Sequence, residues 1–110
     1  AVEYERMARY IHETVTVKTG NYLVFAPSYQ VMEQVADRCV AYEDMECIRQ
    51  ESGMAEEERE AFLKEFEIER NHSLVGFCVM GGIFSEGIDL TEDRLIGALI
   101  IGRCAENGRS

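Results

Sequence analysis

A glycine-rich segment with two carboxylates, Gly81–Leu90, holds the residues best suited to ligand binding. It reads Gly-Gly-Ile-Phe-Ser-Glu-Gly-Ile-Asp-Leu and follows an apolar run, Leu74–Met80, that is typical of a buried strand. Glycines let backbone amides approach a ligand closely because no Cβ stands in the way. Since ligands of open α/β sheets bind at the carboxyl ends of the strands, we expect a binding site here.

Phosphate is the ligand that these residue types favour. Gly81 and Gly82 can offer backbone amides to an anion, and Ser85 adds a hydroxyl. The chain has neither a GxxxxGK[ST] cradle nor a GxGxxG motif, so it holds no complete nucleotide site of its own. Its two histidines, His12 and His72, fall in a predicted helix and a loop, away from any serine or cysteine at a strand end. We expect both to be surface residues rather than members of a nucleophile–base pair.

The elements that must position this segment alternate along the chain. Apolar residues at helical spacing mark the helices, and continuous apolar runs with valine and aromatics mark strands buried on both faces. Such alternation predicts an α/β fold with a mainly parallel sheet flanked by helices, in which Ser28 caps the second helix. The predicted helices are Glu3–Val17, Tyr29–Tyr42 and Ala55–Arg70, and the predicted strands are Tyr22–Ala26, Met45–Gln50, Leu74–Met80 and Leu95–Ile101.

Size and charge limit the functions that the chain can have. Its 110 residues suffice for one small domain, and 46% hydrophobic content with one proline is typical of a globular protein. A net charge of −10, taken alone, argues against nucleic acid as a partner. Much of the acid falls within Glu56–Glu69, however, and we interpret it as one solvated helix face.

The cysteine pattern excludes the common metal sites. None of the four cysteines forms a CxxC pair, so neither zinc nor an iron–sulfur cluster is expected within this chain. Cys39 and Cys78 fall on apolar faces and are predicted core residues, which fits a reducing cytoplasm. No apolar run reaches the roughly 18–20 residues of a membrane helix. The chain opens on Ala1, and we expect it to be a piece of a larger protein.

Three segments together resemble the second RecA-like domain of superfamily two helicases, in the DinG/XPD-like branch. Gly82 with Ser85–Leu90 resembles motif V of that branch, and Leu23–Tyr29 resembles its motif IV strand. Gln50 and Gly53–Arg59, followed by two phenylalanines, resemble the helix between these motifs. The resemblance covers roughly residues 3–102 and implies a three-layer RecA-like, P-loop-NTPase-type domain over residues 1–102, containing motifs IV to V.

The resemblance also implies two groups of site residues. One group would contact single-stranded DNA: Ser28, Tyr29, Gln50, Arg59, Gly81, Gly82 and Ser85. The other would face the ATP cleft between the two RecA-like domains: Glu86, Gly87 and Asp89. Asp89 would hold an arginine finger or the nucleotide ribose. Because motif V would touch both ligands, hydrolysis could change the grip on DNA.

Several features of the family are absent from this sequence. The glutamine and arginines of motif VI are missing, and Gly108-Arg109 is only a superficial echo of them, so we expect the tail 103–110 to be truncated or foreign to the family. The first RecA-like domain, with its Walker A lysine and any iron–sulfur cysteines, is missing too. ATP and Mg²⁺ would therefore bind in the full-length enzyme, with that domain as partner. The fragment alone should bind no cofactor and be inactive.

Two other classes fit parts of the pattern. A flavodoxin-like or receiver-type signalling domain shares the alternation, but it would need clustered acids where Ala26-Pro27-Ser28 follows the first strand. A protein-interaction module could instead use the acidic helix Ala55–Arg70. Binding of a basic partner that depends on Glu56–Glu58 would favour this second alternative.

Overall fold

A four-stranded parallel sheet lies at the centre of the computed structural model, which describes residues 3–80 and 96–101. The strands follow the order β2-β3-β1-β4, and each neighbouring pair is parallel. The predicted parallel sheet is therefore confirmed. The strand bounds are β1 Asn21–Ala26, β2 Met45–Arg49, β3 Ser73–Val79 and β4 Gly97–Ile100.

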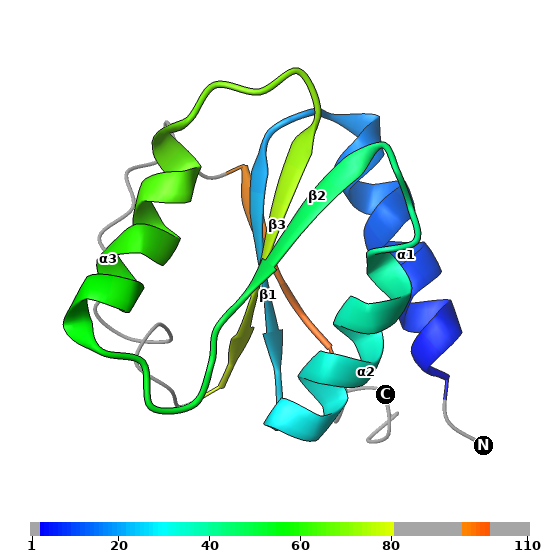
Figure 1. Cartoon of the computed structure of the whole chain (residues 1–110). Coiled ribbons are helices and arrows are strands. Elements are labelled where there is room, and N and C mark those ends of the chain that lie inside the picture. The colour runs from blue at the N-terminus through cyan, green and yellow to red at the C-terminus, as the bar shows by residue number, and fades with distance from the viewer. Residues whose placement is uncertain (1–2, 81–95, 102–110) are drawn as a thin grey trace.

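Helices cover both faces of this sheet and give three layers (Figure 1). Helices α1 (Tyr4–Val17) and α2 (Tyr29–Cys39) pack on one face. Helix α3 (Glu56–Lys64) and the short 3₁₀ helix η1 (Glu65–Glu67) lie on the other. The predicted three-layer α/β architecture is confirmed, and none of the helices described here is long and apolar enough to cross a membrane.

Strand β3 lies inside the sheet and is covered by helices on both of its faces. All seven of its residues are buried, as expected for an apolar run sandwiched between two helical layers. Its side chains point alternately to the two faces of the sheet and pack into two separate cores. Val75, Phe77 and Val79 face α1 and α2, whereas Leu74 and Cys78 face α3.

Gly76 of β3 lets η1 and α3 approach the sheet closely. A Cβ placed at this glycine would lie 2.7 Å from Cζ of Phe66 and 3.1 Å from Cζ of Phe62. Both phenylalanines are buried, and their ring centroids are 5.8 Å apart. The missing side chain thus makes room for the aromatic pair that anchors this layer.

Helix α3 is shorter than predicted. A helix over Ala55–Arg70 was expected, but the α-helix ends at Lys64 and η1 ends at Glu67. Side chains take the place of the next helical N–H groups. Arg70 donates to the carbonyls of Glu65 (2.6 Å) and Ile68 (3.5 Å), and Asn21 donates to the carbonyl of Phe66 (3.0 Å). These bonds satisfy the exposed carbonyls of the last turn, so the helix can end early.

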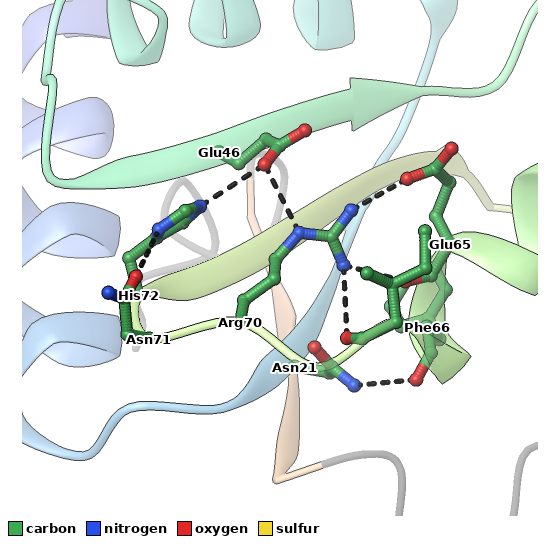
Figure 2. A network of polar contacts seen from close by, with 8 residues as sticks. Asn21, Glu46, Glu65, Phe66, Arg70, Asn71 and His72 are labelled. Atoms are coloured by element: carbon green, nitrogen blue, oxygen red, sulfur yellow. Dashed lines mark hydrogen bonds and ion pairs between the residues drawn. The ribbon is translucent and has the colours of Figure 1, made fainter.

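Arg70 also ties the end of this layer to strand β2 (Figure 2). Its side chain is 9% exposed, and its guanidinium pairs with the carboxylates of Glu46 (3.1 Å) and Glu65 (2.6 Å). His72 makes a second contact with Glu46, at 3.1 Å. The hydrogen bond from His72, followed by that from Arg70, holds the pKa of Glu46 below its usual value of 4.5.

Because the pKa of Glu46 is lowered, we expect its ion pairs to stabilise the fold less at acidic pH. A carboxylate with a depressed folded-state pKa stabilises the fold above its unfolded pKa, and that contribution is lost as the pH falls through the folded value. Glu46→Gln should therefore lower the free energy of unfolding at pH 6 by up to about 1 kcal/mol, because Glu46 is partly exposed. The difference from wild type should shrink towards zero as the pH falls below 4.5. Chemical denaturation at a series of pH values measures it.

Glu57→Gln provides the matched control, since Glu57 is an exposed carboxylate in the first turn of α3. At pH 6 this control should change the free energy of unfolding by less than Glu46→Gln does, because substitutions of exposed surface residues usually have small effects. A Glu46→Gln effect that persisted unchanged at low pH would show that the charge of Glu46 does not contribute.

Both histidines contact acids near the start of β2. His12 lies 2.8 Å from the Asp44 carboxylate and stacks on the Tyr42 ring, with centroids 4.0 Å apart. Tyr42 and Asp44 both follow the end of α2. This helix was expected to reach Tyr42 but ends at Cys39. Both histidines are partly exposed, and His72 also contacts the side-chain oxygen of Asn71 at 3.2 Å.

Candidate functional site

The carboxyl ends of β1, β2 and β3 meet at one edge of the sheet because the strands are parallel. Two backbone bonds extend the ladders past the strand ends to this edge. Met80 donates to the carbonyl of Ala26, and Gln50 donates to the carbonyl of Phe77, both at 2.8 Å. The residues that follow each strand are therefore held at the same level, and Met80 leads directly into the glycine-rich segment.

Ser28 begins helix α2 at this edge, as predicted. Its backbone is extended, with φ −156° and ψ 164°, and its hydroxyl oxygen accepts a hydrogen bond of 3.2 Å from the N–H of Val31. This is the usual geometry of a serine N-cap. The cap fixes the direction in which α2 leaves β1, and so it positions the next residue, Tyr29.

Gln50 is the central polar residue of the edge. It is only 3% exposed, and its side chain connects two elements. The carboxamide oxygen accepts from the N–H of Val79 at 3.0 Å, and the carboxamide nitrogen donates to the hydroxyl of Tyr29 at 3.1 Å. A backbone N–H can only donate, so the Gln50 oxygen has to face Val79 and its NH₂ group has to face Tyr29.

This orientation determines what the Tyr29 hydroxyl can do. Its oxygen accepts the bond from Gln50, so its own hydrogen remains available to an outside acceptor. A buried amide that makes two good hydrogen bonds holds the phenol in one position. The sequence places Tyr29 and Gln50 in one predicted site, and the structure brings them together. Gln50 itself is enclosed, which makes it a positioning residue for Tyr29 rather than an exposed contact.

Arg59 lies apart from this pair. It is on α3, across the sheet from α2 (Figure 1), and its side chain is 41% exposed. Its guanidinium lies 3.6 Å from the Glu56 carboxylate, one helical turn away. Such an exposed pair on one helix contributes little to stability, so the arginine can exchange partners readily.

The remaining predicted site residues belong to the segment 81–95, which lies outside the described residues. They are the DNA-contact residues Gly81, Gly82 and Ser85 and the ATP-cleft residues Glu86, Gly87 and Asp89. Within residues 3–80 and 96–101, no group of histidine, cysteine and acidic side chains is arranged to hold a metal ion.

Sequence reasoning missed the role of Val79. Its N–H donates to the Gln50 side chain. Every residue of a buried strand except proline has such an N–H, so the sequence gives no sign of which one bonds to a side chain. One signal was present in Gln50 itself. A polar amide directly after a predicted strand, in a fold this small, has to find hydrogen-bond partners once it is buried.

Comparison with known proteins adds one finding to this geometry. The family model described as Helicase C-terminal domain matches residues 11–105. The match includes all of the edge residues described above as well as the glycine-rich segment. No solved structure matches the chain.

Proposed function

Because the chain belongs to the helicase C-terminal domain family, we propose that it is the second motor domain of an ATP-dependent DNA helicase. We assign it to the DinG/XPD-like branch, acting in the cytoplasm, with single-stranded DNA and a first RecA-like domain as its partners. The motif V resemblance of Ser85–Leu90 supports the branch. The position of that segment directly after β3 supports its place in the site.

The available hydrogen of the Tyr29 hydroxyl is the observation that carries the proposal. Gln50 donates to the phenol oxygen, so the Tyr29 O–H can still donate to another acceptor. A phosphate oxygen of single-stranded DNA is such an acceptor, and contacts to phosphate require no base sequence. The acidic chain would add little electrostatic attraction, so most basic contacts would come from the rest of the enzyme.

The nucleotide would be met on the other side of the same segment. Glu86, Gly87 and Asp89 would face ATP and Mg²⁺, which supply the phosphoryl chemistry when bound together with the first RecA-like domain. Gly81, Gly82 and Ser85 would meet the DNA backbone. Val79, which bonds to Gln50, precedes Gly81 by two residues, so a shift of the segment on hydrolysis would reach Tyr29 through a short connection.

Two substitutions at Tyr29 test the proposal in the intact enzyme. Tyr29→Phe removes the hydroxyl and should weaken binding of single-stranded DNA by about two- to twelvefold, which corresponds to one hydrogen bond of about 0.5–1.5 kcal/mol. Tyr29→Ala should weaken it further if the ring also stacks on a base, a contact worth about 1–3 kcal/mol. Fluorescence anisotropy with a labelled oligonucleotide measures both effects.

Tyr10→Phe is the matched control, because Tyr10 is a 59% exposed tyrosine on α1, away from the edge. Binding is to be measured well below the unfolding transition of each variant, since Tyr29→Phe also leaves the Gln50 amide without its partner. Wild-type DNA affinity in Tyr29→Phe and Tyr29→Ala would remove Tyr29 from the DNA path.

A further inference from the structure

Two cysteines face each other across the seam between α2 and β2. Cys39 is the last residue of α2 and is fully buried, and Cys47 lies in the middle of β2 and is partly exposed. Both pack in the core between the sheet and the α1–α2 layer, and their thiols hydrogen-bond to each other. Neither residue belongs to the edge that carries the proposed function, so the pair has no role in the site described above.

Ion pairs hold this seam in place. Arg49, two residues after Cys47 and on the same side of β2, pairs with Glu33 and Asp37 of α2. The distance to the Asp37 carboxylate is 3.0 Å. These ion pairs fix helix and strand to each other close to the two cysteines in the sequence.

The two sulfurs are chemically unequal. The hydrogen bond from Cys39, followed by the charge of Arg49, sets the pKa of Cys47 below its usual value, against the effect of burial. The same hydrogen bond, together with burial, raises the pKa of Cys39. Cys47 is also the more accessible of the two, because β2 lies at one end of the described strand order. A lower-pKa, accessible thiol beside a protonated one is the arrangement of an attacking and a resolving cysteine.

We propose that Cys39 and Cys47 form a reversible redox site, which small-molecule disulfides oxidise to an internal disulfide. The Cys47 thiolate attacks one sulfur of the small disulfide, so that a mixed disulfide forms and one small thiolate leaves and takes up a proton. The Cys39 thiol then attacks Sγ of Cys47 and passes its proton to the departing small thiolate. The Cys39–Cys47 bond forms, the mixed disulfide breaks, and a second small thiol leaves.

Electrons balance in this exchange, because the two cysteines lose the two electrons that reduce the small disulfide to two thiols. Intracellular disulfides of this kind are usually transient and redox-sensing, which agrees with the location that we propose. The product would link the C-terminal end of α2 covalently to β2. Its formation does not depend on the proposed helicase function.

Cys78 offers an internal comparison. It lies on β3 in the other core, is fully buried, and burial raises the pKa of its thiol to about 12. No other described cysteine shares its core. It should therefore stay reduced under conditions that oxidise Cys39 and Cys47.

Oxidised glutathione and peptide mass spectrometry test the proposal on the folded chain. After oxidation and alkylation of free thiols, trypsin cleaves at Arg38 and Arg49 and releases both cysteines on one peptide, 39–49. This peptide should be unalkylated and lighter by two hydrogens. Further cleavage after Glu43 and Glu46 should separate Cys39 from Cys47 only after reduction. Cys78 should be unoxidised, whether it is alkylated while folded or only after denaturation.

Three variants sharpen the result, each checked for its unfolding transition in reductant. Cys39→Ser should stop at the glutathione adduct on Cys47, Cys47→Ser should leave Cys39 reduced, and Cys78→Ser should still form the disulfide. The proposal is overturned if the folded wild type accumulates the glutathione adduct with Cys39 still reduced. Disulfides only between two chains, or no reaction of either thiol before unfolding, would overturn it equally.

Discussion

Phe66→Ala is expected to lower the free energy of unfolding by about 3–5 kcal/mol, the usual cost of truncating a buried phenylalanine. The side chain is 2% exposed and packs on the sheet at Gly76 and against Phe62. It belongs to the smaller of the two cores, which has few side chains to fill the space left behind. Chemical denaturation of the chain, followed by far-UV circular dichroism, measures the change.

Two further variants test the reason for this effect. Ile68→Ala removes an apolar side chain two residues away that is 52% exposed, and it should change stability by less than about 0.5 kcal/mol. Gly76→Ala should destabilise by about 1–3 kcal/mol through overpacking, and by less when Phe66 is already alanine, because the crowded atom is then gone. A near-zero shift in Phe66→Ala would show that the residue is not part of the core.

Asp89→Ala in the intact enzyme is expected to reduce the DNA-stimulated ATPase rate by about 10²-fold. The resemblance to motif V implies that this carboxylate would face the ATP cleft and orient an arginine finger or the ribose. Losing a group that positions a reacting part typically costs a factor of that size. Steady-state ATP hydrolysis with saturating single-stranded DNA measures the effect.

Asp44→Ala is the matched control, since Asp44 is an exposed aspartate before β2, at the opposite end of the sheet strands. It should leave the ATPase rate close to wild type. The denaturation curve of Asp89→Ala should match wild type, so that loss of activity is not loss of fold. Wild-type turnover in a correctly folded Asp89→Ala enzyme would remove Asp89 from the cleft.

The fold could be predicted because its signals are local and repeated. Strands β1 and β3 are apolar on both faces, and only a sheet covered by helices on both sides buries such strands. Ser28 predicted the start of α2 because its hydroxyl oxygen accepts a bond from a backbone N–H three residues later. The motif resemblance is likewise confirmed at the level of a helicase C-terminal domain, whereas its branch and its DNA substrate remain proposals.

The remaining features depend on residues that are distant in the sequence. Helix α3 ends early because Asn21, from a strand more than 40 residues earlier, donates to the Phe66 carbonyl. The orientation of Gln50 depends on Val79, and the pairing of Cys47 depends on the end of another helix. No periodicity or local motif encodes such contacts, since they arise only when the layers pack.

The strand order also has a consequence for how the chain folds during synthesis. Strand β1 is made early, but both of its neighbours come much later, from β3 and β4. A ribosome would therefore release β1 tens of residues before any strand could pair with it, and closing that long a loop slows folding. Until β3 emerges, the apolar face of Tyr22, Val24 and Ala26 has only α1 and α2 to cover it. Packing of α1 and α2 against this face would thus protect the nascent chain from aggregation until β3 has been made.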